Sequence, residues 1–307
     1  DLKKPEDRAQ VEKLVARADI LIQNFRPGVM ERLGLDYGSA RKINPRLIYA
    51  EVTGYGKRGP WRDKPGQDLL VQALSGLVWL NGDADQPPTP FGLATADLAA
   101  GACLVQGILA CLVRRAATGE GGLVEVSLLE AVLDYQFEVL TTHLNDGGKL
   151  PARSAVNNAH AYLGAPYGIY ATVDGYLALA MGSVKKLGEI LQCEALGAYS
   201  DSETWFTHRD EIKRILGGHF KSQPTAHWLS ILEPADVWCS DVFTWPELLR
   251  HEAFKALDML QNVHRNNGAS LTTTRCPIRI DGEVYKSSAG APRVGENNGE
   301  IAKEFGF

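Results

Sequence analysis

A long apolar segment constrains the fold of this chain more than any other feature. Residues 97–117 are predicted to form one helix with apolar side chains on nearly all sides, and Gly119 provides a stop just beyond its end. A helix that is apolar all round is typical of a protein interior. Its apolar part, residues 98–113, contains two glycines and a glutamine and is shorter than the roughly 20 residues that a bilayer requires. We therefore expect a central, buried helix and no membrane span.

The N-terminal part of the chain alternates between helical and strand patterns. A helix is predicted over residues 5–18, where a proline opens the segment and apolar residues recur at helical spacing. Short strands are predicted at residues 19–23 and 47–53, with a short helix ending near Gly34 between them. Strand, helix and strand at this spacing predict a parallel layer, so the expected fold class is α/β.

The character of the sequence changes near residue 145. A polar segment rich in glycine, proline and asparagine follows, and then a hairpin is predicted over residues 168–181 with its turn at Asp174 and Gly175. Further elements are predicted as helices near residues 183–197, 209–221 and 225–233 and as strands at 260–264 and 278–280. We expect a large α/β domain, a linker, a smaller α+β domain and a C-terminal segment that returns to the large domain, over residues 1–145, 146–165, 166–250 and 251–307.

Charge and cysteine content narrow the functional classes. The chain has 32 Lys and Arg against 37 Asp and Glu, but residues 1–64 hold 14 basic and 9 acidic side chains. The overall acidity argues against nucleic-acid binding, whereas the local basic excess indicates either a solvated helix face or a site for a small anion such as a nucleotide phosphate. The five cysteines are widely spaced without a CxxC pair, so neither a disulfide framework nor structural zinc is expected. With no secretory signal in the sequence, we expect a cytoplasmic protein.

One motif match is expected to be misleading. Residues 54–59 fit GxGxxG after a strand, but a dinucleotide site requires that loop to open a helix. Pro60 and Pro65 follow instead, so we predict an irregular loop over residues 54–66 and no nicotinamide site. The sequence contains no P-loop, HExxH or GxSxG motif, and its seven histidines are scattered, which does not favour a metal cluster or a histidine base.

Asp97 stands out at the start of the apolar helix. Small side chains surround it in the sequence Ala94-Thr95-Ala96-Asp97. Its carboxylate could cap the free N–H groups of the helix end, and residue types alone favour this structural role. The alternative is a preorganised nucleophile, because the small neighbours leave room around the carboxylate.

Short sequence blocks spread along the whole chain carry a family resemblance. They are DILIQNFRPGVMERLGL (19–35), NPRLIY (44–49), GYGKRGP (54–60), GQDLL (66–70), SGL (75–77), ADL (96–98), TGEGG (118–122) and TTRCPI (273–278). In this order they resemble the class III coenzyme A transferases, the CaiB/BaiF family. The resemblance implies a parallel-sheet large domain, a smaller α+β domain, and a homodimer in which each chain threads through a ring in the other.

The resemblance also implies a mechanism. An aspartate attacks an acyl-CoA to give an aspartyl-acyl anhydride, the CoA thiolate converts this into an aspartyl-CoA thioester, and an acceptor carboxylate then takes the CoA. Asp97 occupies the nucleophile's position, and covalent catalysis would divide one hard exchange into easier steps. Backbone N–H groups near Asp97 are expected to stabilise the tetrahedral oxyanion. Acyl-CoA and a small carboxylic acid are then the substrates, with no permanently bound cofactor and no metal.

Further site residues are implied at positions that match the family. Positions where relatives hold the phosphates, ribose or adenine of CoA are Lys3, Asn24, Phe25 and Arg32. Positions beside the thioester are Gly66, Gln67 and Asp68. From the residues alone, Arg32 could equally form an ion pair, Phe25 could pack in the core, and Asp68 could cap the helix that begins there.

Two alternatives to CoA transfer stay open. The α-methylacyl-CoA racemases also resemble this chain, but they place a histidine at the position of Gln67, and an amide cannot titrate near neutrality. Gln67 therefore favours transfer. The second alternative is a non-catalytic CoA-binding remnant, because relatives are expected to begin upstream of Asp1, which would make this chain a fragment or a truncation. The sequence does not indicate which acids are donor and acceptor.

Overall fold

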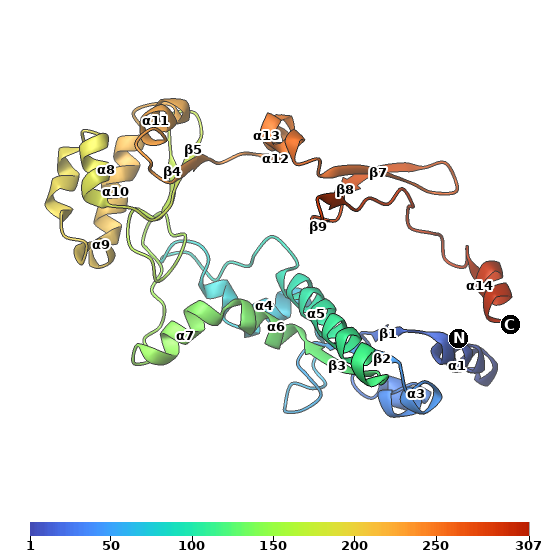
Figure 1. Cartoon of the computed structure of the whole chain (residues 1–307). Helices are drawn as coiled ribbons and strands as arrows, with labels where there is room; N and C mark the ends of the chain where they lie inside the picture. Colours follow the sequence, from blue (N-terminus) through green and yellow to red (C-terminus); the bar gives the residue numbers. More distant parts are fainter. Residues whose placement is uncertain (307) are drawn as a thin grey trace. The chain divides into compact units, whose positions relative to one another are not determined.

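The computed structural model describes residues 1–306 and divides into two compact units (Figure 1). The first unit spans Asp1–Asp241 and the second begins at Val242. The four-part division that the sequence suggests, with boundaries near residues 145, 165 and 250, stays a prediction. The two units are described in turn.

A three-stranded parallel sheet organises the N-terminal half of the first unit. Its strands are β1 (Ile20–Gln23), β2 (Ile48–Thr53) and β3 (Gly122–Ser127), in the order β1-β2-β3. The helices of this half are α1 (Pro5–Arg17), α2 (Val29–Leu33), α3 (Tyr37–Ile43), α4 (Asp68–Leu74), η1 (Leu77–Trp79), α5 (Thr95–Thr118), α6 (Leu128–Tyr135) and α7 (Phe137–Asn145). The predicted parallel α/β layer is confirmed, with β3 as an additional strand that the sequence did not reveal.

The alternation of side chains along β2 divides the core between the two faces of the sheet. Tyr49 is fully buried in a cluster with residues of α1, α2 and α3, and its hydroxyl donates a hydrogen bond to the carbonyl of Leu35 at 3.0 Å. Ile48 and Ala50 point the other way and pack with Leu104 and other residues of α5. The central strand is therefore covered on both sides, as a parallel sheet requires.

The structure corrects the expectation that the apolar helix is central and buried. The buried residues of α5 lie on one face, and they are Ala96, Ala99, Ala100, Leu104, Ile108 and Cys111. The opposite face remains apolar but open, with Leu98 63% and Val113 74% exposed. Within residues 1–306, α5 is the one helix whose length and composition would allow it to cross a membrane, a test that the core helix of a globular protein also passes. The pattern of hydrophobic residues predicted the helix correctly, but it did not predict that one face of the helix is exposed.

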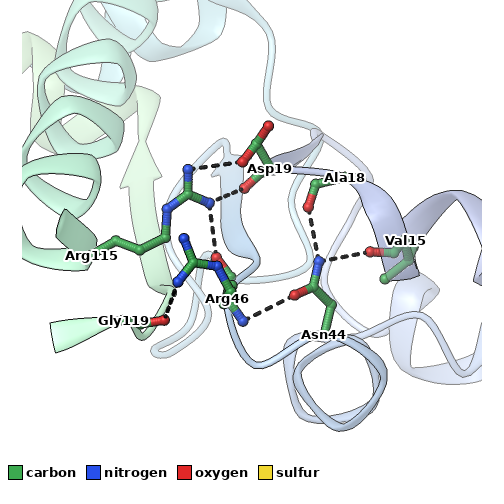
Figure 2. A network of polar contacts seen from close by, with 7 residues as sticks. All are labelled: Val15, Ala18, Asp19, Asn44, Arg46, Arg115 and Gly119. Carbon is green, nitrogen blue, oxygen red and sulfur yellow. Dashed lines mark hydrogen bonds and ion pairs between the residues drawn. The ribbon is translucent and has the colours of Figure 1, made fainter.

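A polar network joins the C-terminal end of α5 to the N-terminal helices (Figure 2). Arg115 donates to the side chain of Asp19 at 2.9 Å and to the carbonyl of Arg46 at 3.0 Å. Arg46 in turn donates at 3.2 Å to the carbonyl of Gly119, which ends α5 in a left-handed conformation. Asn44 donates to two carbonyls at the end of α1, at 2.9 and 3.0 Å. These bonds satisfy carbonyl groups that helix ends leave without a partner.

The remainder of the first unit is a small antiparallel α+β layer. Its strands, in the order β4-β5-β6, are β4 (Gly168–Ala171), β5 (Tyr176–Leu179) and β6 (Cys239–Asp241). Its helices are α8 (Val184–Ile190), η2 (Glu194–Tyr199), α9 (Thr204–Thr207), α10 (Arg209–Phe220) and α11 (Thr225–Leu232). The predicted hairpin is confirmed, and Asp174 at its turn accepts a hydrogen bond from the backbone N–H of Thr225 at 2.9 Å. That bond fixes the start of α11 against the hairpin.

The second unit contains short elements. They are α12 (Trp245–Arg250), α13 (Glu252–Ala256), β7 (Leu260–His264), β8 (Ser270–Thr274), β9 (Arg279–Ile280), β10 (Glu283–Val284) and α14 (Asn298–Phe305). The strands predicted at residues 260–264 and 278–280 are present, and each pairs in an antiparallel hairpin, β7 with β8 and β9 with β10. Arg275, which follows β8, is buried and donates to the carbonyls of Leu257 and Asp258 at 2.8 and 2.6 Å.

Candidate active site

Asp97 lines a cavity at the carboxyl ends of the parallel strands. It is the third residue of α5, and the cavity beside it has a volume of about 300 Å³. Asn24 and Phe25 follow β1, Thr53 ends β2 and Gly54 follows it, and all four line the same cavity. Ligands in parallel α/β sheets bind at this edge, because the loops that follow the strands converge there.

Asp68, and not Asp97, caps the N-terminus of α5. The Oδ2 atom of Asp68 accepts hydrogen bonds from the backbone N–H groups of Ala96 at 2.8 Å and Asp97 at 3.2 Å. Its Oδ1 atom accepts from the side-chain amide of Gln72 at 2.5 Å, so this buried carboxylate is well bonded. Among residues 1–306, the side chain of Asp97 has no hydrogen-bond partner. The capping interpretation of Asp97 is therefore wrong, and its carboxylate is available to a ligand.

The N–H groups at this helix end are occupied. The N–H of Thr95 donates to the carbonyl of Leu93 at 2.8 Å, and those of Ala96 and Asp97 donate to Asp68. An oxyanion requires donors that are free to turn toward it. The N–H groups of the first turn of α5 already have acceptors, and the expectation that backbone N–H groups near Asp97 stabilise an oxyanion stays a prediction.

The surroundings raise the pKa of Asp97 above its usual value of 3.8. Partial burial of the carboxyl group is the larger cause, and the negative charge of Asp68 adds to it. Both effects make the ionised form of Asp97 less stable than that of an aspartate in water. The site thus holds a carboxylate without a hydrogen-bond partner, and its surroundings make the negative charge of that carboxylate less stable.

The residues that the resemblance implied fall into three places. Asn24, Phe25 and Gly66 line the cavity of Asp97. Lys3, Phe25 and Arg32 line a second cavity of about 560 Å³, and Phe25 belongs to both. Gln67 and Asp68 line neither cavity in the part of the chain that the structure describes. Gln67 caps α4, where its Oε1 atom accepts a hydrogen bond from the N–H of Leu69 at 3.2 Å.

Four basic residues of the two cavities were missed by the sequence analysis. Arg26, Arg62 and Lys64 line the cavity of Asp97, and Arg8 lines the second cavity. Their signal was the local basic excess over residues 1–64, which did not say which side chains face a site. The cavity that holds the Asp97 carboxylate therefore has a positive lining, which suits an anionic ligand.

The loop over residues 54–66 closes at its base through two glycines. A Cβ atom on Gly54 would lie 2.5 Å from the Cα of Gly66, and a Cβ on Gly66 would lie 2.5 Å from the Cα of Gly54. The Tyr55 hydroxyl donates to the carbonyl of Pro65 at 3.3 Å and ties the same two ends together. No helix begins until α4, so the prediction that the GxGxxG match does not open a helix is confirmed.

A row of polar side chains crosses the three strands of the sheet and contacts the backbone at Phe25, a residue of the site. Gln23, Glu51 and Glu125 lie opposite one another on β1, β2 and β3. Gln23 accepts a hydrogen bond from the N–H of Phe25 at 2.8 Å and donates to Glu51 at 3.1 Å. Lys57 forms ion pairs with both Glu51 and Glu125. Burial raises the pKa of Glu51, and the Lys57 ammonium opposes that rise.

Comparisons with known proteins place this geometry in context. The sequence model of the protein family described as CoA-transferase family III matches residues 1–298. The chain is 32% identical to the acetyl-CoA:oxalate CoA-transferase of Acetobacter aceti, over 99% of this chain and 78% of that protein. It is also 29% identical to the human α-methylacyl-CoA racemase, over 100% of this chain and 80% of that protein.

A solved structure confirms the fold. The crystal structure of a CaiB/BaiF family protein from Brucella suis superposes with a TM-score of 0.82 at 28% identity, and the match covers 99% of this chain and 80% of that one. A likeness of this extent shows the same α/β architecture with a small additional layer. The relatives include both a transferase and a racemase, so the choice between those chemistries depends on the site.

Proposed function

Because the chain belongs to CoA-transferase family III, we propose that it moves coenzyme A from an acyl-CoA to a small carboxylic acid through covalent intermediates on Asp97. The observation that carries this proposal is the carboxylate of Asp97, which has no partner among residues 1–306 and faces a cavity with a basic lining. Asp68 supports it by taking over the capping of α5, which leaves Asp97 available.

The proposed reaction proceeds by four balanced acyl exchanges. A carboxylate oxygen of Asp97 attacks the thioester carbon, the C–S bond breaks, and an anhydride and CoA thiolate form. The thiolate attacks the aspartyl carbon, which releases the donor acid and leaves an aspartyl-CoA thioester. The acceptor carboxylate then attacks this thioester, the C–S bond breaks, and a second anhydride with Asp97 and free CoA thiolate form. Attack of the thiolate on the acceptor's carbon gives the new acyl-CoA and restores the aspartate, and no proton is consumed.

The two cavities suggest how the substrate lies. The thioester end of acyl-CoA would occupy the cavity of Asp97, beside Gly66, and the nucleotide end would extend past Phe25 and Asn24 toward Lys3 and Arg32. Asp68 and Gln67 would act as positioning residues through α5 and α4. In this proposal CoA is a substrate, and the reaction needs neither a metal nor a permanently bound cofactor.

The racemase alternative needs two titrating groups near carbon 2 of the acyl chain. Asp97 is the one acid among the described residues that line its cavity, and that lining contains no histidine. Gln67, at the position where racemases carry a histidine, is an amide engaged in capping α4. These features favour transfer over racemisation.

A homodimer is the assembly we propose for this chain. The exposed face of α5 carries Leu98, Val105, Leu109 and Val113, and water-exposed apolar side chains in a row are costly unless another surface covers them. A second copy is the partner that the family resemblance implies.

We also propose a cytoplasmic location. All five cysteines, Cys103, Cys111, Cys193, Cys239 and Cys276, are free thiols in the structure, which suits a reducing compartment. Fractionation of the native host followed by immunoblotting tests this location, and recovery in a membrane or secreted fraction would contradict it.

Intact-mass spectrometry tests the proposed chemistry. After incubation with an acyl-CoA donor and no acceptor, the protein should gain the mass of CoA less one water, and peptide mapping should locate the adduct on Asp97. The variant Asp97→Asn should gain no such mass, whereas Asp63→Asn, on the exposed loop, should behave as the wild type. An adduct that persists in Asp97→Asn would exclude the mechanism. Exchange of the C2 proton in D2O without CoA transfer would support racemisation, and CoA binding without either reaction would support a non-catalytic remnant.

A further inference from the structure

Two arginine side chains from different segments converge on Gly28. The position that a Cβ would take on Gly28 lies 3.2 Å from Nη1 of Arg32 and 3.9 Å from Nη2 of Arg62. The two nitrogens are thus separated by no more than the sum of these distances. Arg32 belongs to α2, whereas Arg62 belongs to the loop over residues 54–66, so only the fold brings them together.

The two guanidinium groups are not neutralised by nearby carboxylates. Within residues 1–306, no carboxylate oxygen lies within 4.0 Å of Arg32. The one such contact of Arg62 is with its neighbour Asp63 at 3.9 Å, and the Asp63 side chain is 86% exposed. Two like charges at this separation repel, and an anion between them would reverse that interaction.

The two arginines line different cavities, and these cavities share one lining residue. Arg62 lines the cavity of Asp97, Arg32 lines the second cavity, and Phe25, three residues before Gly28, lines both. A ligand that extends from one cavity to the other would therefore pass between the two arginines. Gly28 has φ of +86°, which other residues rarely adopt, and its missing side chain leaves the intervening space open.

We infer that Arg32 and Arg62 together bind one phosphate group of the CoA substrate. This inference rests on the proposed function and assigns a binding role to Arg62, which neither the family resemblance nor the sequence pattern indicated. A phosphate presents several acceptor oxygens, and the planar guanidinium group matches them with paired N–H donors. Two arginines around one point can therefore hold different oxygens of the same phosphate.

Loop closure gives Arg62 a defined place. Gly54 and Gly66 contact each other at the base of the loop, and Tyr55 packs edge-on against Trp61, the residue before Arg62. The arginine is consequently held by a short closed segment rather than by an open chain. Such preorganisation lowers the entropy lost when the ligand binds.

Calorimetric titration with CoA tests the inference. The variant Arg62→Ala should bind CoA about 10- to 100-fold more weakly, as expected for loss of a charge-assisted hydrogen bond. Arg58→Ala, on the same loop but outside both cavities, should bind CoA as the wild type does. Circular dichroism checks that both variants fold, and Arg62→Lys should lie between wild type and Arg62→Ala because it keeps the charge but not the paired donors.

The phosphate itself is identified by using shortened substrates. The wild-type preference for acetyl-CoA over acetyl-pantetheine, measured as the ratio of kcat/KM values, should fall about tenfold in Arg62→Ala. If wild type and Arg62→Ala bind 3′-dephospho-CoA with equal affinity, the two arginines bind the 3′-phosphate. If the variant still binds 3′-dephospho-CoA more weakly than the wild type does, they bind the pyrophosphate. Both results support the inference.

Other outcomes overturn it. Wild-type CoA affinity in Arg62→Ala, or strictly additive effects of Arg32→Ala and Arg62→Ala in the double variant, would show that the two arginines do not share one phosphate. In either case CoA transfer by the wild type would leave the proposed function intact. If the wild type neither binds nor transfers CoA, the proposed function and this inference both fail.

Discussion

The side chain of Asp68 accepts a hydrogen bond from the backbone N–H of Asp97, across 29 residues of sequence, at 3.2 Å. The carboxylate of Asp68 thereby caps α5, and the carboxylate of Asp97 does not. The same proximity places two negative charges together, which contributes to the raised pKa of Asp97. Asp68 therefore influences both the start of α5 and the pKa of Asp97.

Replacing Asp68 by asparagine should move the acid limb of activity to lower pH. The amide keeps a hydrogen-bond acceptor for α5 but removes the charge that raises the pKa of Asp97, so Asp97 should ionise at lower pH. Because the proposed mechanism requires the carboxylate as the attacking form, activity should persist further into acid than in the wild type. The measurement is the pH profile of kcat/KM, and an unchanged acid limb would contradict the electrostatic role of Asp68.

The variant Asp68→Ala should instead lower stability. It leaves two backbone N–H groups of α5 without their acceptor and removes one of the two acceptors of the Gln72 amide, and the site is buried. We expect a loss of about 1–3 kcal/mol in the free energy of unfolding, measured by urea denaturation. Asp63→Ala, at an exposed position, serves as the control and should change this free energy by less than about 0.5 kcal/mol.

A methyl group on Gly54 or Gly66 should disrupt the loop that lines the cavity of Asp97. Either Cβ would meet backbone at 2.5 Å, which no side-chain rearrangement can relieve. Gly54→Ala and Gly66→Ala should therefore raise KM for acyl-CoA and lower kcat. The matched control is Gly101→Ala on α5, where a Cβ would meet no atom within 4 Å. There alanine should stabilise the helix by about 0.5–1 kcal/mol, and equal behaviour of all three variants would exclude the close-contact explanation.

Removal of the Lys57 ammonium should destabilise the chain in a pH-dependent way. In Lys57→Met the buried Glu51 loses its cation, which we expect to cost about 1–3 kcal/mol near neutral pH. The folded-state pKa of Glu51 is raised, so protonation favours the folded form, and the deficit should shrink as pH falls through that pKa. Urea denaturation from pH 4 to pH 8 measures this trend. Arg41→Gln, which breaks an exposed pair with Glu120, should change little at any of these pH values.

A charge on the exposed face of α5 should dissociate the proposed homodimer. Leu109→Lys introduces an ammonium into the apolar row, and burying it against a second copy would be unfavourable. Light scattering after size-exclusion chromatography should give the mass of one chain for this variant and of two chains for the wild type. Val294→Lys, at another exposed apolar residue, should leave the dimer unchanged. A monomeric wild type would contradict the proposal.

Local sequence patterns predicted the elements whose causes are local. The apolar periodicity and the Gly119 stop gave α5 to within two residues at its start and one at its end, and the Asp174-Gly175 turn gave the β4–β5 hairpin. The strand β3 was missed because Glu125 interrupts its apolar run and two glycines precede it. The prediction that α5 is buried on all sides was wrong, because hydropathy shows that a surface is apolar but not whether another part of the chain covers that surface.

The support of the candidate site could not be deduced from sequence, because it depends on pairing between distant segments. The row of Gln23, Glu51 and Glu125 exists only in the register that the parallel sheet adopts. Asp68 becomes the cap of α5 only when α4 and α5 pack together. Asp97 itself was identifiable from its place at the helix start and from the family resemblance, but residue types alone favoured the wrong role for it.

The network of Arg46 and Arg115 has a consequence for Asp97 at the opposite end of α5. A helix can slide or screw along its axis by a turn, about 5.4 Å, when its termini are loose. Here hydrogen bonds hold both ends of α5. Asp68 binds the first turn, and the last turn is held through Arg115 and the carbonyl of Gly119. A helix that is fixed at both ends would hold the carboxylate of Asp97 at a constant position relative to the sheet.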